Sequence, residues 1–435
     1  MPVVQQGSVN TTALVVPDLY VQIVPPQNLV LNGVPTDGVG GVGTASRGPV
    51  NQPVTVGSMV DYARNFGPIM PVRYDLGTQV ATSVQQGAQS FRCVRVTDGT
   101  DAAAAAAFGG SGNQVAVNLV ARNSGSLGNS FTATLLTGSQ AGSFRLVLAA
   151  PGLQPEVFDN IVGTGPVFWQ ALADAVNNGS GPLRGPSRYF VAVTGPNGIL
   201  VPNVGMSVQA SGGTDGAIGM TSAMMVGLDT LPRSGVYALR GQGCSIALLA
   251  DVDDWATWST QAGFGLQEGC YMILAGPAGD TIANAAAKKG QAGLDSYAAK
   301  LMFGDWIWWQ DTANGMTRLV SPQGFVAGRL ANLSPEQSSL NKPLYGVIGS
   351  QRSGAPGSGQ TTSYSAAELA TLLTAGVDVI SNPQPAGTFW GVRGGHNSSS
   401  NAGTNGDNYT RLTNYISATL AAGMGQYVGE VIQAG

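Results

Sequence analysis

The chain has 435 residues, of which 10% are charged, 63 are glycine and 3 are cysteine, and its formal net charge is -4. This length has room for roughly two to four domains of ordinary size. The negative net charge and the lack of Lys/Arg clusters argue against a nucleic-acid partner, and three cysteines far apart in the sequence argue against a disulfide framework. No stretch approaches the length needed to cross a bilayer, so direct membrane insertion is not expected.

The N-terminal region is predicted to be an extended arm followed by a loop. Ala13–Pro25 is rich in β-branched residues and reads as a strand that needs a sheet to join. A glycine-rich loop is predicted over Asn32–Gly43, and Gly38–Gly43 within it matches the GxGxxG pattern. The match to a dinucleotide site is weak, because the pattern leads into extended chain and not into a helix.

The stretch Thr44–Pro68 specifies a turn and a capped helix. Arg47-Gly48-Pro49 ends an extended segment, since the proline keeps Gly48 out of helical geometry. Ser58 is the predicted N-cap, with Asp61 in the first turn, and Phe66-Gly67-Pro68 ends the helix. The residues predicted to form its apolar stripe are Val56, Met59, Val60 and Ala63.

A composition change then separates two kinds of pattern. A helix over Leu76–Gln86 and a strand over Phe91–Val96 precede an Ala/Gly linker at residues 99–113. Short alternating strands and one helix, from about Val167 to Asn177, follow within residues 114–211. This β-rich segment is predicted to be an insertion that closes at the glycine-rich hinge Gly212–Gly216.

Strand–helix–strand alternation returns beyond that hinge. Ser245–Ala250 and Cys270–Ala275 are short apolar runs on either side of a helix, which is typical of buried parallel strands with crossover helices. Asp251, Asp253 and Asp254 follow the first run, where helix capping explains acids better than a metal site does. The aromatic run Trp306–Trp309 is interpreted as core packing.

Catalytic chemistry is hard to assemble from these residues. The one histidine, His396, lies in a Gly/Ser/Asn-rich stretch and is predicted to be a solvated loop residue. No nucleophile elbow, phosphate loop, HExxH or CxxC motif occurs. We therefore nominate no catalytic, cofactor-binding or metal-binding residue. Two alternatives stay open. One is a nucleotide-binding α/β enzyme using Gly38, Gly40 and Gly43 and the acids after Ala250, and the other is a carbohydrate-binding surface protein using the inserted segment.

Six motifs in order resemble those of the contractile tail sheath proteins of myovirus-type bacteriophages, a family shared with R-type pyocins and other contractile injection systems. They are Arg47-Gly48-Pro49 with Phe66-Gly67, Gly128-Asn129 within Ala121–Leu135, Gly212–Gly216, the aromatic segment Ser296–Asp311, Pro322, Gly324, Ala327 and Gly328 within Ser321–Leu330, and Leu369–Ile380 followed by Trp390-Gly391-Val392-Arg393. Each motif is loose by itself. Together they span nearly the whole chain.

The resemblance implies an α/β (α+β) sheath core of mixed sheet flanked by helices, with an inserted β-rich protruding domain. The expected divisions are an arm and loop at 1–43, core at 44–98, a linker at 99–113, the inserted domain at 114–211 and core again at 212–435. It implies a structural virion protein, not an enzyme, made in the bacterial host cytoplasm. Stacked rings of subunits would surround a tail tube and contract to drive it through the host envelope. The implied partners are other sheath subunits, the tube protein, and baseplate and tail terminator proteins, without a cofactor.

The resemblance also nominates residues for assembly. The candidate inter-subunit arm is Val15, Val16, Leu19, Tyr20, Val21 and Ile23; the candidate arm pivot is Arg47, Gly48 and Pro49; and the candidate C-terminal strand is Tyr427, Val428, Val431 and Ile432. Family members usually continue into a further helix and a C-terminal arm. A truncated chain is therefore expected here.

Overall fold

The computed structural model describes residues 3–6, 20–23, 32–109, 115–182, 184–196, 203–360 and 362–425. The chain divides into two compact units, residues 35–415 and residues 1–34 with 416–435. In the smaller unit, β1 (Val3–Gln6) and β2 (Tyr20–Ile23) form a parallel pair in which Val3 is opposite Tyr20.

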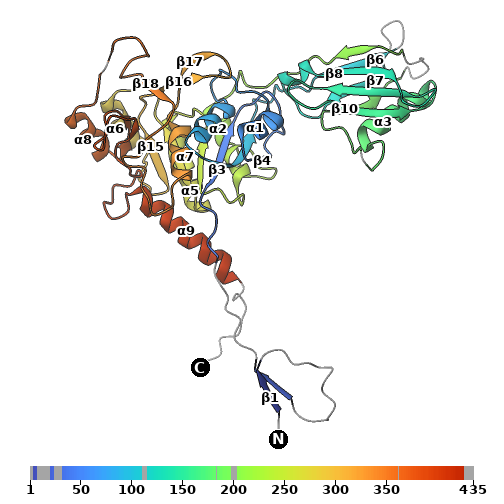
Figure 1. Ribbon diagram of the computed structural model, residues 1–435. Coiled ribbons are helices and arrows are strands. Elements are labelled where there is room, and N and C mark those ends of the chain that lie inside the picture. Colours follow the sequence, from blue (N-terminus) through green and yellow to red (C-terminus); the bar gives the residue numbers. More distant parts are fainter. Residues whose placement is uncertain are drawn as a thin grey trace. The chain divides into compact units, whose positions relative to one another are not determined.

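The core of the larger unit is a seven-stranded sheet in the order β19-β15-β14-β13-β3-β5-β4. Strands β3, β4 and β15 of this sheet are labelled in Figure 1. Its strands are β3 (Gly38–Gly43), β4 (Pro53–Val56), β5 (Ser90–Arg95), β13 (Ile246–Leu249), β14 (Tyr271–Ala275), β15 (Ala299–Met302) and β19 (Val377–Asp378). All neighbours are parallel except β4, which runs antiparallel to β5 at the edge. The predicted parallel strands with crossover helices are confirmed.

The prediction of a loop over Asn32–Gly43 was wrong for Gly38–Gly43, which is the buried strand β3. Its glycines are required by close packing. A Cβ on Gly40 would lie 2.8 Å from Leu239 Cδ1, and one on Gly41 would lie 2.9 Å from Leu76 Cδ1. The strand therefore lets both helical layers approach the centre of the sheet more closely than side chains would allow.

Helices cover both faces of this sheet. One apolar cluster contains residues of α1 (Met59–Phe66), α2 (Leu76–Gln85) and α7 (Gln323–Ala331). The cluster on the other face contains residues of α4 (Ser222–Val226), the 3-10 helix η3 (Gly235–Leu239), α5 (Trp258–Glu268), α6 (Ile282–Gln291) and α8 (Ala366–Thr374). The mixed α/β class, with sheets flanked by helices, is confirmed.

Helix α1 has the predicted ends but a different buried face. Ser58 Oγ accepts a hydrogen bond from Asp61 N at 3.2 Å, and Gly67 follows the helix with φ +90°. The predicted apolar stripe is confirmed for Val56, which is buried, and for Met59, which packs against the core, but it was wrong for Val60 and Ala63, which are exposed. Tyr62 and Phe66 are buried in their place. The aromatic pair takes the core side because two large rings remove more apolar surface from water than valine and alanine do.

The inserted segment contains two small sheets and a helix. The sheets have the orders β10-β9-β8-β12 and β11-β7-β6, and α3 (Pro166–Asn178) shares their apolar core. The strands are β6 (Ala105–Gly109), β7 (Val115–Ala121), β8 (Thr132–Thr137), β9 (Phe144–Ala149), β10 (Glu156–Ile161), β11 (Phe190–Thr194) and β12 (Ser207–Gln209), and the 3-10 helix η2 spans Ser126–Ser130.

The predicted linker at residues 99–113 contains a strand, so the linker interpretation was wrong for Ala105–Gly109. Ala104, Ala106 and Phe108 are buried in the core of the inserted segment, and the strand pairs antiparallel with β7. A run of identical alanines has no period-2 pattern, so composition suggested a linker where alternate residues are in fact buried.

The remaining elements belong to the larger unit, except that the last helix begins in it and ends in the smaller unit. They are β16 (Ile307–Asp311), β17 (Met316–Val320) and β18 (Val347–Ser350) in one antiparallel sheet, β20 (Ile380–Ser381) with β21 (Gly391–Val392), the short 3-10 helix η4 (Trp255–Thr257), and α9 (Asp407–Met424). Trp309 on β16 is 6% exposed and packs in the core, as predicted for this aromatic run. No helix in the described ranges is long and apolar enough to cross a membrane.

Candidate functional site: arm residues, an arginine junction and a buried ionic cluster

The candidate assembly residues fall in different parts of the structure. Tyr20, Val21 and Ile23 of the candidate arm lie on β2, where Val21 is 39% exposed. The other arm candidates, Val15, Val16 and Leu19, lie outside the described residues. So do all four candidates for the C-terminal strand, Tyr427, Val428, Val431 and Ile432. Their roles stay predictions.

Arg47, the first residue of the candidate pivot, lies buried between α1 and the inserted segment. Its guanidinium stacks 5.3 Å from the centre of the Phe131 ring and 5.5 Å from that of Tyr189. It also donates to the carbonyls of Arg64 at 3.4 Å and Arg188 at 3.3 Å. Burial lowers the pKa of Arg47, although the group remains a cation at any physiological pH.

A second buried arginine lies beside the rest of the candidate pivot. Arg95 donates to the carbonyl of Gly48 at 2.8 Å, of Ser124 at 2.7 Å and of Asp215 at 3.0 Å. Gly48 has φ +112° and Pro49 is half-buried. The two arginines thus bind backbone oxygens on both sides of the junction between core and inserted segment, which we call the arginine junction.

A buried ionic cluster joins the first turn of α9 to the sheet. Lys300 on β15 lies 2.6 Å from Asp378 on β19 and 3.1 Å from Asp407 at the start of α9, and all three side chains are fully buried. Burial raises the pKa of each carboxyl, but the Lys300 ammonium and hydrogen bonds outweigh burial, so the pKa values of Asp378 and Asp407 are lowered. The pKa of Lys300 is correspondingly raised. All three groups are therefore charged at neutral pH.

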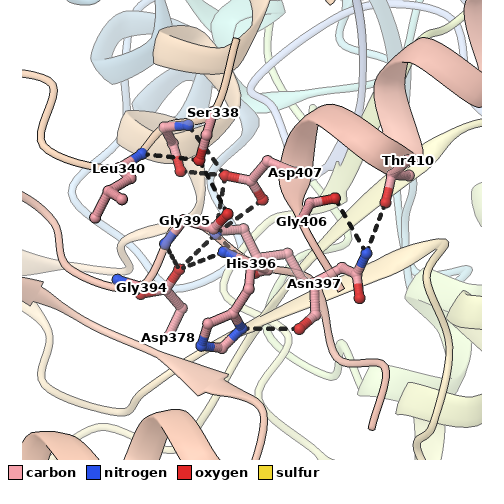
Figure 2. Close-up of polar contacts among 12 residues, drawn as sticks. Ser338, Leu340, Asp378, Gly394, Gly395, His396, Asn397, Gly406, Asp407 and Thr410 are labelled. Carbon is pink, nitrogen blue, oxygen red and sulfur yellow. Dashed lines mark hydrogen bonds and ion pairs between the residues drawn. The ribbon is translucent and has the colours of Figure 1, made fainter. Parts of the chain in front are cut away.

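Hydrogen bonds from three segments saturate the two carboxylates. Figure 2 shows those that residues 394–396 donate to Asp378. Asp378 accepts from the backbone N–H groups of Gly394 at 2.7 Å, Gly395 at 2.8 Å and His396 at 3.3 Å. Asp407 accepts from the Tyr271 hydroxyl at 2.6 Å and from Ser339, through both its N–H and its hydroxyl. Such saturation is what lets buried charges persist.

His396 participates through its backbone, so its prediction as a solvated residue was wrong. Its carbonyl accepts from Lys300 Nζ at 2.9 Å, its ring Nδ1 lies 2.8 Å from the carbonyl of Asn397, and the residue is half-buried. Sequence inspection missed the cluster because Lys300, Asp378 and Asp407 are separated by up to 107 residues and no motif marks them. The only signal is an ionisable residue within each of two apolar strands.

The acids after β13 behave as capping and pairing groups. Asp254 accepts from Ala256 N at 3.0 Å, and Asp253 pairs with Arg73 at 2.6 Å. Asp251 is buried and accepts from Gln79 Nε2 at 2.9 Å and Tyr74 N at 3.2 Å. Among the described residues no group of three or more His, Cys, Asp or Glu is placed to hold a metal ion.

No protein-family model matches the chain, and no curated protein matches it either. Solved structures do match the chain in fold. A sheath tail protein from Desulfitobacterium hafniense has a TM-score of 0.63 at 14% identity, covering 94% of this chain and 83% of its own. The sheath tail protein of Listeria innocua has a TM-score of 0.63 at 14% identity, covering 91% and 79%. This chain therefore has the fold of these sheath tail proteins over nearly its whole length.

Proposed function

We propose that this protein is a contractile tail sheath subunit. It would be a structural protein of a phage virion, or of a related contractile particle, and not an enzyme. Copies would polymerise as stacked rings around a tail tube and contract to drive that tube through the host envelope. The observation that carries the proposal is the similarity in fold to two sheath tail proteins over more than nine-tenths of this chain.

The ordered motifs noted in the sequence support the same proposal independently of the fold comparison. The proposed partners are other copies of the chain, the tube protein, and the baseplate and tail terminator proteins. Synthesis in the bacterial cytoplasm is part of the proposal, as is exchange of terminal strands between neighbouring copies.

Electron microscopy of the purified protein tests the proposal directly. We expect hollow, transversely striated cylinders in negative stain at high protein concentration. Deletion of residues 1–25 should leave a folded monomer, judged by its thermal melt, but abolish the cylinders. Monodisperse particles at every concentration and ionic strength would contradict the sheath function, and unaltered cylinders from the deletion would contradict the role of the arm.

The nucleotide-binding alternative is not favoured by the structure. Its three glycines lie within the buried strand β3, and the space beside Gly40 and Gly43 is filled by Leu239, Tyr74 and Leu76. A dinucleotide site needs those glycines in the turn between a strand and a helix. Titration calorimetry with nicotinamide and adenine nucleotides should therefore give no binding heat.

A further inference from the structure

Strand β11 of the inserted segment is an uncharged edge strand. It spans Phe190–Thr194 at the end of the sheet β11-β7-β6, and β7 is its one strand neighbour in the described part of the chain. Its sequence is FVAVT, which is rich in β-branched residues and has no charge and no proline, and Val193 is 55% exposed. An edge strand of this composition is a template for pairing with another chain, so we searched its edge for a block.

The even-numbered residues of β11 point their backbone polar groups away from β7. The Tyr189 carbonyl, just before the strand, accepts from Arg122 N at 2.8 Å, and Gly195 N, just after it, donates to the Ala116 carbonyl at 2.8 Å. These two bonds turn the odd-numbered residues toward β7, because alternate residues of a strand direct their hydrogen bonds to opposite sides. Ala192, at the centre of β11, therefore presents its N–H and its carbonyl to the free edge.

Asn177 binds both of these groups. Ala192 N donates to Asn177 Oδ1 at 2.9 Å, and Asn177 Nδ2 donates to the Ala192 carbonyl at 2.8 Å. An opposing residue in an antiparallel strand would make the same pair of bonds. A side-chain amide carries the donor and the acceptor of a peptide group. Asn177 thus takes the place that the next strand of the sheet would occupy.

The last turn of α3 brings Asn177 to that edge. Helix α3 packs against β11, β10 and β7, and Gly179, with φ +91°, follows its end. The chain beyond the helix is bonded to the same turn, because Ser187 N donates to the Val176 carbonyl at 2.8 Å. Ser187 Oγ in turn accepts from Phe190 N at 3.0 Å. One helical turn therefore covers the edge of β11, and hydrogen bonds hold it there.

The other three edges of the inserted segment are interrupted in different ways. Strand β10 has a bulge between Phe158 and Ile161, in which Asn160 has φ +60°. Strand β12 is three residues long. Strand β6 is bonded to the chain at its start, where Ala105 N donates to the Ser211 carbonyl at 2.8 Å and accepts from Ser211 N at 3.0 Å through its carbonyl. Bulges, short strands and covered edges all oppose sheet extension.

We propose that Asn177 is a built-in block on strand addition, without which β11 pairs with β11 of a second copy. Loss of the amide lets the last turn of α3 open more often and leaves an uncharged strand edge free. A second copy supplies an identical strand, and two identical edges can pair antiparallel about a two-fold axis. This inference does not depend on the proposed sheath function. In a sheath, the block would keep strand exchange to the terminal segments.

Hydrogen exchange measures the block directly in the full chain. Asn177→Ala should speed exchange of the Ala192 N–H by about tenfold, the effect of losing two hydrogen bonds of ordinary net strength. Mass spectrometry of the peptide that contains β11 gives the rate. Asn178→Ala is the matched control, because Asn178 is the next residue of α3 and is exposed. Equal rates in the two variants would overturn the block.

Self-association gives a second readout. In sedimentation velocity, at concentrations below those at which wild type assembles, Asn177→Ala should form dimers and larger species while Asn178→Ala stays monomeric. Adding Val193→Lys to Asn177→Ala should restore the monomer, because a lysine on an exposed edge position opposes pairing of two edges. A role in fold stability alone would not respond to this second substitution. Association that persists with Val193→Lys would contradict pairing through β11.

A thermal melt of each variant shows whether it folds. Asn177→Ser, whose hydroxyl is too short to bond both groups of Ala192, takes the place of Asn177→Ala if the alanine variant is unfolded. Unfolding of both would make Asn177 a residue needed for folding and would overturn the block. The sheath function is judged separately, since cylinders from wild type together with unchanged exchange and association in Asn177→Ala would leave that function standing and the block wrong.

Discussion

At the scale of single residues, Lys300 decides whether two buried carboxylates are tolerated. Removing one partner of a buried, hydrogen-bonded charge pair leaves an uncompensated charge. We expect Lys300→Met to lower the free energy of unfolding by about 3–5 kcal/mol, measured by urea denaturation. Arg64→Met is the control: it removes an ion pair whose side chains are 60% and 44% exposed, and it should cost less than about 0.5 kcal/mol. Equal effects of the two substitutions would contradict this role.

The ionic cluster also makes the free energy of unfolding depend on pH. The folded-state pKa values of Asp378 and Asp407 are lowered, so their contribution to stability is present above the unfolded pKa near 3.8 and is lost as pH falls through the folded values. The raised pKa of Lys300 makes its contribution present below 10.5 and lost as pH rises through the folded value. The difference in unfolding free energy between wild type and Lys300→Met should therefore be widest between about pH 5 and 9 and should shrink in acid.

The pKa of Asp75 is shifted in the opposite direction from those of Asp378 and Asp407. Burial raises its pKa to about 7, although hydrogen bonds from Thr78 and the charge of Arg318 oppose the shift. One carboxyl oxygen caps α2 by accepting from Thr78 N at 2.7 Å, while Oδ1 has no partner in the described part of the chain. The folded state holds this proton more tightly than the unfolded state, so stability falls as pH rises from about 4 to 7.

Replacing Asp75 by asparagine keeps the cap and removes the ionisation. We expect Asp75→Asn to match wild type at pH 4–5 and to be more stable by about 2–4 kcal/mol above pH 7. Urea denaturation across this pH range checks it. A variant that is less stable than wild type at pH 8 would show that the buried carboxylate is tolerated through contacts that asparagine cannot make.

At the scale of elements, β3 depends on its missing side chains. A Cβ on Gly43 would lie 2.8 Å from the Tyr74 carbonyl oxygen and 2.9 Å from Leu76 N, both backbone atoms that cannot move aside. Gly43→Ala should therefore destabilise the protein by about 1–3 kcal/mol. Gly263→Ala on α5 has open space and should be neutral or slightly stabilising. Thermal melts of the two variants compare them, and equal melting temperatures would contradict the close-packing explanation.

These elements also show which parts of the fold the sequence could predict. The strands β13 and β14 and the helices α2 and α3 were predicted correctly, because apolar spacing and turn residues agree there. Strand β3 and the alanine strand β6 were missed. Glycine and alanine carry no periodic signal, and their role is decided by what packs against them.

The candidate sites were less predictable than the elements. The sequence correctly places Arg47 before a turn. Its contacts with Phe131 and Tyr189, however, join segments up to 142 residues apart and follow from tertiary packing alone. The ionic cluster likewise joins residues that are far apart in the sequence. Such contacts become visible only when the sheet order is known, because neighbouring strands β15 and β19 are far apart in sequence.

At the scale of the whole molecule, the inserted segment begins and ends at adjacent points of the core. Asp98 N donates to the Gly216 carbonyl at 2.7 Å, and Thr214 Oγ1 donates to the Thr100 carbonyl at 2.8 Å. A short glycine linker between Thr100 and Thr214 can therefore close the gap. We expect the shortened protein to fold, because the core sheet and its two apolar clusters contain no residue of the insertion.

The arginine junction predicts how the shortened protein will differ from wild type. Excision removes Phe131 and Tyr189, the rings that cover Arg47, and Ser124, which accepts from Arg95. Arg47 keeps the Arg64 carbonyl but loses both rings and the Arg188 carbonyl. A guanidinium that stays half-buried with fewer partners costs free energy, so the melting temperature should fall. Adding Arg47→Gln should recover part of that loss in the shortened protein, whereas the same substitution should destabilise the full chain. Differential scanning calorimetry measures the change in melting temperature that Arg47→Gln causes in each protein. A rise in the shortened protein and a fall in the full chain would establish Arg47 as the link between core and insertion. Changes in the same direction would assign its role to the core alone.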